Sequence, residues 1–385
     1  MLGAMSDLST SSNVPRSGAT SRRRALRWLV PVGAVGVVAL IASGVLSAGA
    51  NPNLAPQTSA QLLASVGDAK LSGFSGTVIE KASLGLPELP NIAGPGGSSS
   101  SGLLGMLTGS HTVRVWYGGE TEQRLALVDS LGEQDVFRNG RDLWQWDSES
   151  RIATHTLLPT DAAKINGAPA EQTPYVSPSD AAARALALID PSTTVTTEAT
   201  EVVAGRSAYT LVLTPKDGRS RVGSVRISVD GKTKVPLRVV VTARGSNQAA
   251  IDVGFTQVRF AAPDQDNFTF KPAAGVTIKE SPAPAAISPG AKAGNAPVPA
   301  GAGYTVIGSG WTSVAKLTGV PSLSALTRDS GEVGPLIGGL PAVSGTWGSG
   351  HLFTSSLISA LLTNDGRAYV GAVDPEVLYQ AASRG

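Results

Sequence analysis

The sequence predicts a mainly β chain, with antiparallel strands, a few flanking helices and a small α+β domain at its C-terminus. Two observations carry this prediction, and a third indicates which residues form the core. Between residues 111 and 260, apolar and polar residues alternate at the period of two expected of half-buried strands. Turn sequences such as Asn139-Gly140 separate these runs, and short turns of this kind join antiparallel hairpins. Aromatic residues make up only 5% of the chain, so a core has to rest on Val, Leu, Ala and Ile.

Residues 1–50 predict an export signal. The first 20 residues are rich in Ser and Thr and are typical of a cytoplasmic tail, and Arg22–Arg24 then precede an apolar run over residues 28–50. A positive flank before an apolar run directs export, and Ala48-Gly49-Ala50 matches the small-x-small pattern of a cleavage site. We therefore predict an extracytoplasmic protein, in the cell envelope or secreted.

Two properties of this signal stay open. The stretch Ser21–Arg27 resembles a twin-arginine signal, with Ala25 where that pattern prefers Phe, so both Sec and Tat export fit. The apolar run is long enough to cross a hydrocarbon core of about 30 Å as a retained anchor. Pro31 and several glycines argue instead for removal after Ala50. A buried core helix is a third interpretation, which the basic flank disfavours.

Residues 51–280 are expected to form the first domain. A short helix capped by Ser59, with an apolar stripe around Leu62, opens it, and a strand over residues 73–80 follows. Residues 84–105 are rich in Gly, Pro and Ser and have no periodicity, which predicts a long loop. Long loops in compact domains are often functional, and this one is a candidate lid over a cavity.

The remaining elements of this domain are two groups of strands around one helix. An Ala-rich helix is expected over residues 179–189, capped by Ser177 or Ser179. The parity of the apolar positions changes between Phe255 and Val258, which predicts a bulge near Thr256–Gln257. The expected strands are 111–117, 124–128, 135–138, 143–146, 151–157, 207–214, 222–229, 237–242 and 251–260, with an edge at Phe268–Phe270.

A linker separates this domain from a smaller one. Residues 281–302 are almost entirely Ala, Pro, Gly and Ser, which is typical of an interdomain linker. Residues 303–385 are expected to form an α+β domain, ending in a helix that starts at Asp374-Pro375. Its candidate strands are 304–307, 351–354, 358–362 and 368–372.

The order of these elements and a few stretches of sequence carry a family resemblance. The stretches are residues 62–79, the run Asp142-Leu143-Trp144-Gln145-Trp146-Asp147, and residues 229–272 from Val229-Asp230-Gly231 to Phe268-Thr269-Phe270-Lys271-Pro272. They resemble the lipoprotein-carrier superfamily of LolA, LppX and RseB, which is bacterial and extracytoplasmic. Residues 365–373 resemble the C-terminal domain of RseB, so the two-domain arrangement is RseB-like.

The resemblance implies a curved, incomplete antiparallel β-barrel, with helices and a loop at its open side and an apolar cavity for acyl chains. Apolar contact is non-directional, so such a cavity leaves no sharp motif. For each cavity-wall residue, core packing is the alternative interpretation. The expected ligand-binding residues are Phe74, Val113, Val115, Trp144, Trp146, Val225, Ile227, Leu237, Val239 and Phe255.

Catalytic chemistry finds little support in the sequence. There is no cysteine, which excludes disulfides, thiolate metal sites and a lipidated cysteine anchor. His111, His155 and His351 are isolated and lack metal-ligand spacing. Residues 313–316 match S-x-x-K, but the companion motifs of penicillin-binding enzymes are missing. We expect neither an enzyme nor a cofactor or metal.

The charge pattern also limits the partners. The net charge is +2, without the clustered basic face of a nucleic-acid binder, so no nucleic acid is expected. Arg219 and Arg221 are expected at a hairpin tip, either solvated or in contact with a phosphate headgroup.

Three functions follow from these expectations. The first is an extracytoplasmic carrier of a lipid or acylated protein, which would also touch the membrane through its N-terminal segment if that segment is retained. The second is an RseB-like sensor, whose C-terminal domain binds a membrane-bound anti-sigma factor. The third is a scaffold without a ligand, in which the chain's own side chains fill the cavity.

Overall fold

The computed structural model describes residues 54–67, 69, 71–85, 108–128, 132–159, 177–282, 303–320 and 339–384. The predicted export segment, most of the candidate lid and most of the predicted linker lie outside these residues. Among the helices within them, none is both long and apolar enough to cross a membrane.

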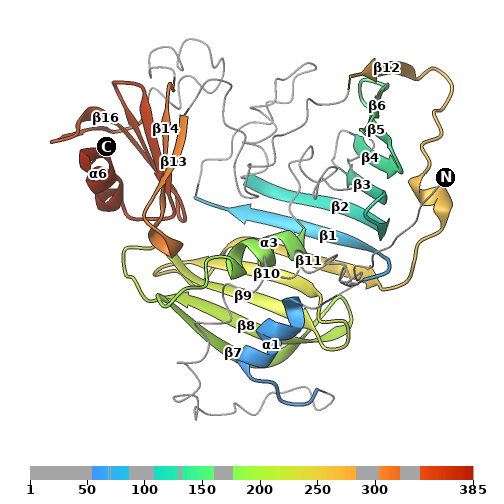
Figure 1. The fold of residues 1–385 in the computed structure, drawn as a ribbon, viewed down its shortest axis with the longest axis horizontal. Coiled ribbons are helices and arrows are strands. Elements are labelled where there is room, and N and C mark those ends of the chain that lie inside the picture. The colour runs from blue at the N-terminus through green and yellow to red at the C-terminus, as the bar shows by residue number, and fades with distance from the viewer. Residues whose placement is uncertain are drawn as a thin grey trace, which may run out of the picture. The chain divides into compact units, whose positions relative to one another are not determined.

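Twelve strands of the described chain form one open sheet, in the order β12-β6-β5-β4-β3-β2-β1-β11-β10-β9-β8-β7 (Figure 1). Neighbouring strands are antiparallel except for β12 and β6. The mainly β, curved and incomplete sheet that the sequence predicts is confirmed. The strands are β1 (Phe74–Ser83), β2 (Thr108–Gly119), β3 (Glu122–Val128), β4 (Glu133–Asn139), β5 (Asp142–Asp147), β6 (Ile152–Leu157), β7 (Thr193–Val203), β8 (Arg206–Pro215), β9 (Val222–Asp230), β10 (Pro236–Ala243), β11 (Ala249–Arg259) and β12 (Thr277–Ser281).

Two helices cover one face of this sheet, called here the helix face. Helix α1 (Ser59–Gly67) and helix α3 (Pro178–Leu186) pack their apolar residues onto strands β7 to β11. The α3 cap is Ser177, whose hydroxyl accepts the Asp180 N–H at 3.0 Å in a capping box. For α1 the expected cap is wrong by one residue. Thr58 Oγ1, not Ser59, accepts the Gln61 N–H, at 3.2 Å.

The hairpin and bulge signals have different outcomes. The β4–β5 hairpin pairs Asn139 with Asp142, so its two-residue turn is Gly140-Arg141, one position later than predicted. Of these two residues, only Gly140 has a positive φ, +62°. Glycine adopts this conformation without a steric cost. The bulge is confirmed, because Thr77 pairs with Gln257 and Val78 with Phe255, leaving Thr256 as the extra residue.

After β11 the chain crosses the other face of the sheet, called here the opposite face. The predicted strand-like edge at Phe268–Phe270 is wrong, because Gln265–Phe268 form a 3₁₀ helix. The Phe270 ring packs on Trp144 with centroids 5.0 Å apart. This crossing brings the chain to the far edge of the sheet, where β12 pairs in parallel with β6. Parallel pairing requires such a crossover connection.

A second sheet of six strands forms in the C-terminal part, in the order β13-β14-β18-β17-β16-β15. Helix α6 (Pro375–Arg384) packs Leu378 and Ala381 onto it, around the fully buried Tyr369. The predicted helix start at Pro375 is confirmed, whereas β14 and β15 are not among the predicted strands. The bounds are β13 (Gly303–Ile307), β14 (Val314–Thr318), β15 (Ala342–Gly345), β16 (Gly348–Thr354), β17 (Ser359–Thr363) and β18 (Arg367–Gly371).

Candidate functional site: the apolar helix face

The strand register decides which of the predicted ligand-binding residues share a face. Directly paired residues on neighbouring strands point to the same side of a sheet. Val78 pairs with Val113 on one side and with Phe255 on the other. The same row of pairs continues through β11 and β10, where Val239 pairs with Val253 and Ile227. Seven of the predicted residues therefore belong to the helix face: Phe74, Val113, Val115, Val225, Ile227, Val239 and Phe255. Leu237 is fully buried at an irregularity in the β9–β10 pairing, so the register does not assign it to this row.

The two tryptophans lie on the opposite face, so the expectation of one common wall is wrong for them. Trp144 pairs with Phe137, which pairs with Arg124, which in turn pairs with Trp116. Trp116 follows Val115 directly in β2, and successive residues of a strand point to opposite sides. Trp144 and Trp146 share a side, as predicted, but it is the side that Phe270 covers.

On the β2–β5 part of the opposite face, aromatic rings surround the ion pair of Arg124 and Asp135. The Arg124 guanidinium lies 4.6 Å from the Trp116 ring centroid and 4.5 Å from that of Phe137. Its Nη2 donates to Asp135 Oδ2 at 2.9 Å. Burial raises the pKa of Asp135 above its ordinary value, and the Arg124 charge only partly offsets this. These contacts make the β2–β5 part of the opposite face a second packed layer, in which aromatic rings enclose a buried ion pair.

The helix face has two halves that differ in what covers them. Over β8 to β10, Val225, Ile227 and Val239 are at most 3% exposed. They belong to one core cluster with Leu62 of α1 and Ala182 of α3. In this half the chain's own side chains occupy the apolar wall, as core packing requires.

Over β1, β2 and β11 the apolar face ends in partly exposed rings. The Phe74 ring stacks on Tyr117 at 5.5 Å and meets the Phe255 ring edge-on at 6.0 Å. Phe260 lies 6.4 Å from Phe74 on its other side. Burial, and to a lesser degree Glu120, raises the pKa of Tyr117 above its ordinary value, so its hydroxyl stays neutral at any physiological pH.

Leu125 and Leu127 of β3 extend this half of the face. They pair with Val115 and Val113 and are half-buried. Together with Phe74, Val258 and Phe260, they border the buried residues Val78 and Val113. The sequence did not single them out as ligand-binding residues. The alternation within the predicted strand 124–128 was the signal that could have done so.

Phe255 also reaches a hollow on the opposite face. This hollow has a volume of about 250 Å³ and is bounded by the β7–β8 turn at Val202–Ala204, with Ile79, Lys81 and Arg238 along its other sides. Phe255 lies next to the Thr256 bulge, where the two faces of β11 exchange. An apolar residue of the helix face thus also lines an opening on the other side of the sheet.

The isolation predicted for the histidines is wrong for His155. Its two ring nitrogens each lie 2.9 Å from a carboxylate oxygen, one of Asp142 and one of Glu280. His351 Nδ1 lies 3.1 Å from the Leu340 carbonyl oxygen. Among the described residues no group of His, Asp and Glu is arranged to hold a metal ion.

The basic pair at the β8–β9 turn contacts residues next to the C-terminal six-stranded sheet, which neither expectation for it foresaw. The Arg221 N–H donates to Ala372 O at 2.9 Å, and the Asp374 N–H donates to Arg219 O at 2.9 Å. The Arg221 guanidinium donates to Ser355 O at 2.6 Å. These bonds tie the turn to the six-stranded sheet.

Two apolar side chains from the C-terminal part of the chain complete this joint. Trp311 and Leu357 belong to the same core cluster as α1 and α3. Trp311 Nε1 donates to Thr193 Oγ1 at 2.7 Å, at a buried position. The core of the twelve-stranded sheet therefore includes residues from beyond the predicted linker.

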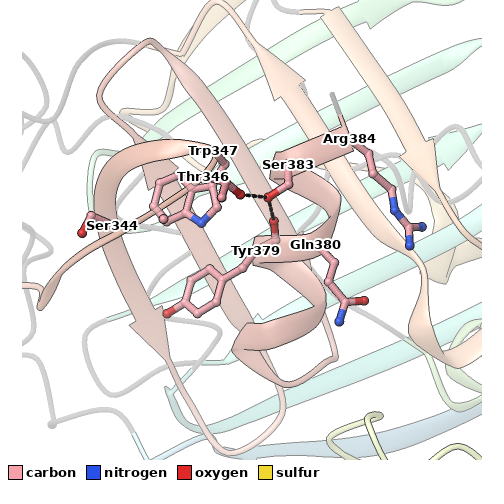
Figure 2. Close-up of a pocket in the computed structure, with 8 residues that line it drawn as sticks. Ser344, Thr346, Trp347, Tyr379, Gln380, Ser383 and Arg384 are labelled. Atoms are coloured by element: carbon pink, nitrogen blue, oxygen red, sulfur yellow. Dashed lines mark hydrogen bonds between the residues drawn. The ribbon is translucent and has the colours of Figure 1, made fainter.

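A second hollow lies on the C-terminal domain, between the β15–β16 turn and the last turns of α6 (Figure 2). It has a volume of about 340 Å³. Tyr379 stacks on Trp347 with centroids 5.7 Å apart. Thr346 Oγ1 and Ser383 Oγ are 3.0 Å apart, and Ser383 Oγ donates to Tyr379 O at 2.9 Å. Among the described residues that line the hollow, Arg384 is the one that is charged.

Comparison with known proteins gives structural likeness only. No protein-family model matches the sequence, and no curated protein matches it. The MucA/MucB complex of Pseudomonas aeruginosa is 16% identical, over 84% of this chain and 96% of that chain, with a TM-score of 0.40. MucB alone is 18% identical, over 84% and 96%, with a TM-score of 0.38. A LolA superfamily protein from Nitrosomonas europaea is 12% identical, over 56% and 99%, with a TM-score of 0.22. The last belongs to the superfamily that the sequence resemblance named. All three TM-scores lie below 0.5.

Proposed function

We propose that this chain is an extracytoplasmic, non-enzymatic protein that binds a lipid or an acylated protein, with acyl chains held against the helix face. The observation that carries the proposal is the half of that face over β1 to β3 and β11. There, buried valines are bordered by half-buried Phe and Leu side chains. The export signal predicted for residues 1–50 supports the extracytoplasmic location.

The chemistry of this border suits an acyl chain. Phe74, Leu125 and Leu127 offer apolar surface without a hydrogen-bonding group, so the ligand surface they cover has to be apolar as well. Covering such a side chain fully contributes about 1.5–3 kcal/mol, and this attraction does not depend on direction. An acyl chain gains from several such contacts at once.

We expect Leu127→Asn to weaken the binding of a fluorescent long-chain fatty acid about tenfold, since about 1.4 kcal/mol of lost contact corresponds to a factor of ten. Leu127 is half-buried at the border of the helix face. Titration of the purified chain measures the dissociation constant, and native mass spectrometry shows whether a lipid of defined mass is bound beforehand.

Leu157→Asn is the matched control. Leu157 is 51% exposed and pairs with Asp142 on the opposite face, so its loss should leave binding unchanged. The proposal fails if the unaltered chain neither carries nor binds a lipid, or if the two variants weaken binding equally.

A second candidate function is a sensor whose C-terminal domain binds an anti-sigma factor. The hollow beside Tyr379 and Trp347 supports it, because its lining combines stacked rings, hydroxyl groups and an arginine, and aromatic residues and arginine are enriched in protein–protein interfaces. Removing residues 303–385 would be a poor test, since Trp311 and Leu357 are part of the main core.

Point variants of the intact chain separate the two functions. If the sensor function is correct, Tyr379→Ala should reduce capture of the anti-sigma factor from the producing cell's envelope about tenfold or more, while fatty-acid binding is retained. Val306→Ala is the control, since Val306 is 50% exposed on β13, at the other edge of the same sheet. Equal capture by the unaltered chain, Tyr379→Ala and Val306→Ala would rule out the sensor function.

A further inference from the structure

His155 lies between two carboxylates at the outer edge of the twelve-stranded sheet. It belongs to β6, and the carboxylates come from the strands on either side, Asp142 from β5 and Glu280 from β12. His155 Nε2 is 2.9 Å from Asp142 Oδ1, and Nδ1 is 2.9 Å from Glu280 Oε2. The ring also stacks on Trp144, with centroids 4.4 Å apart. The imidazole is therefore fixed in place from two strands.

This geometry depends on the protonation state of the ring. A neutral imidazole carries one N–H and one lone pair, so it can donate to only one of the two carboxylates. The other carboxylate would then face a lone pair. The imidazolium carries an N–H on both nitrogens and can donate to both at once.

We infer that His155, Asp142 and Glu280 form a pH-sensitive clasp, which fastens β12 to the edge of the sheet while His155 is protonated. The clasp joins residues that are far apart along the chain, because Glu280 comes after the segment that crosses the opposite face. β12 is also the last described strand before residues 283–302, which lead to the C-terminal domain.

β12 has few other attachments. Four of its five residues are exposed, and its apolar residue Ile278 is 50% exposed. The remaining attachments are the backbone pairing with β6 and the bonds around Arg151, whose carbonyl accepts the Thr277 N–H at 3.0 Å. As an edge strand, β12 is paired on one side only, and it buries little apolar surface. Glu280, whose side chain is 73% exposed, is therefore the carboxylate that leaves when the ring loses its proton.

The direction of the pH effect follows from the groups around the ring. Burial lowers the pKa of His155, but the hydrogen bonds and charges of Asp142 and Glu280 outweigh it and raise the pKa above the ordinary value. No charge comes from the stacked Trp144. A histidine with a raised pKa stabilises the folded arrangement fully below its unfolded value of about 6.5. That stabilisation is lost as the pH rises through the raised value, so the clasp opens on the alkaline side.

Hydrogen exchange of the intact chain tests the clasp. Protection of the amides of residues 277–281, relative to their intrinsic exchange rates, should be about tenfold higher near pH 5.5 than near pH 8. Equal protection at both pH values overturns the inference. Ring NMR of His155 measures its pKa in the same sample.

Two variants make the test specific. Glu280→Gln keeps the side-chain length but removes one charge, so protection near pH 5.5 should fall to the value of the unaltered chain near pH 8. It should then no longer change with pH. Lys279→Gln alters the same strand on its other face and should keep the full pH dependence. Unreduced protection in Glu280→Gln near pH 5.5 would show that pairing with β6 alone holds the strand.

Discussion

Asp230→Ala is expected to lower the free energy of unfolding by about 3 kcal/mol, because breaking a buried ion pair leaves its partner uncompensated. The Asp230 side chain is 1% exposed. Arg206 donates to its two oxygens at 2.6 and 2.9 Å, and the Thr233 N–H donates at 2.7 Å. Arg206 itself is 26% exposed, which places the cost at the lower end of the usual range of about 3–5 kcal/mol. Urea denaturation measures the difference.

The pH dependence of this contribution has a definite sign. Burial alone would raise the pKa of Asp230, but the hydrogen bonds from Arg206 and Thr233 lower it below its ordinary value. The contribution is therefore present above the unfolded pKa of about 3.9 and is lost as the pH falls through the lower, folded value. Asp230→Ala should lose this part of the acid dependence.

Asp217→Ala is the control, because Asp217 also has a lowered pKa but is not buried. It shows whether the loss of stability depends on burial or on the pKa shift alone. Hydrogen bonds from Arg219 lower the pKa of Asp217 to about 2, yet its side chain is 30% exposed and that of Arg219 is 56% exposed. Solvent screens such a pair, so Asp217→Ala should change stability no more than other surface substitutions do. A loss equal to that of Asp230→Ala would contradict the assignment of the cost to burial.

Phe268→Ala is expected to cost about 3–5 kcal/mol, the usual range for removing a buried phenylalanine side chain. Phe268 is 1% exposed and is the buried residue of the 3₁₀ helix on the opposite face. Its ring lies against Gly118, where an added Cβ would be 3.0 Å from two ring atoms. The change in the free energy of unfolding is measured as for Asp230→Ala.

A double-mutant cycle checks that this contact carries the cost. Gly118→Ala should destabilise the unaltered chain, because the new methyl group crowds the Phe268 ring and the Glu122 carboxylate. It should destabilise Phe268→Ala less, because the ring is gone. Additive costs would show that the two residues do not interact, since coupling is expected only for neighbours.

Most strands could be predicted from the sequence, because alternation within one strand is a local property. The edge strand β7 could not. Its sequence, TTVTTEATEVV, is polar and mostly exposed, and its pairing with β8 is interrupted between Glu198 and Glu201. β12 was missed for a related reason, since a short exposed strand has no apolar face to recognise.

The candidate site was predicted only in part, for a reason that lies in the register. Alternation assigns Trp144 and Trp146 to one side of β5, but it does not say which side of the neighbouring strands that is. The answer depends on the three turns between β2 and β5, because each turn sets the register of the strand pair that it joins. One residue more or less in any turn exchanges the faces. The tryptophans consequently belong to the layer under Phe270, and the helix face extends instead to Leu125 and Leu127.

The joint at Trp311 and Leu357 has a consequence for how the chain can be divided. In the sequence, a Pro- and Ala-rich segment separates the strands of the first sheet from those of the second. The buried core is continuous across that division, because Trp311 and Leu357, which follow the segment, pack into the core of the first sheet. A chain ended at residue 302 would open a wet gap next to Thr193 and α3, whereas a cut within 283–302 would leave both pieces still bound to each other. The predicted linker therefore divides the sequence into two parts but does not divide the buried core.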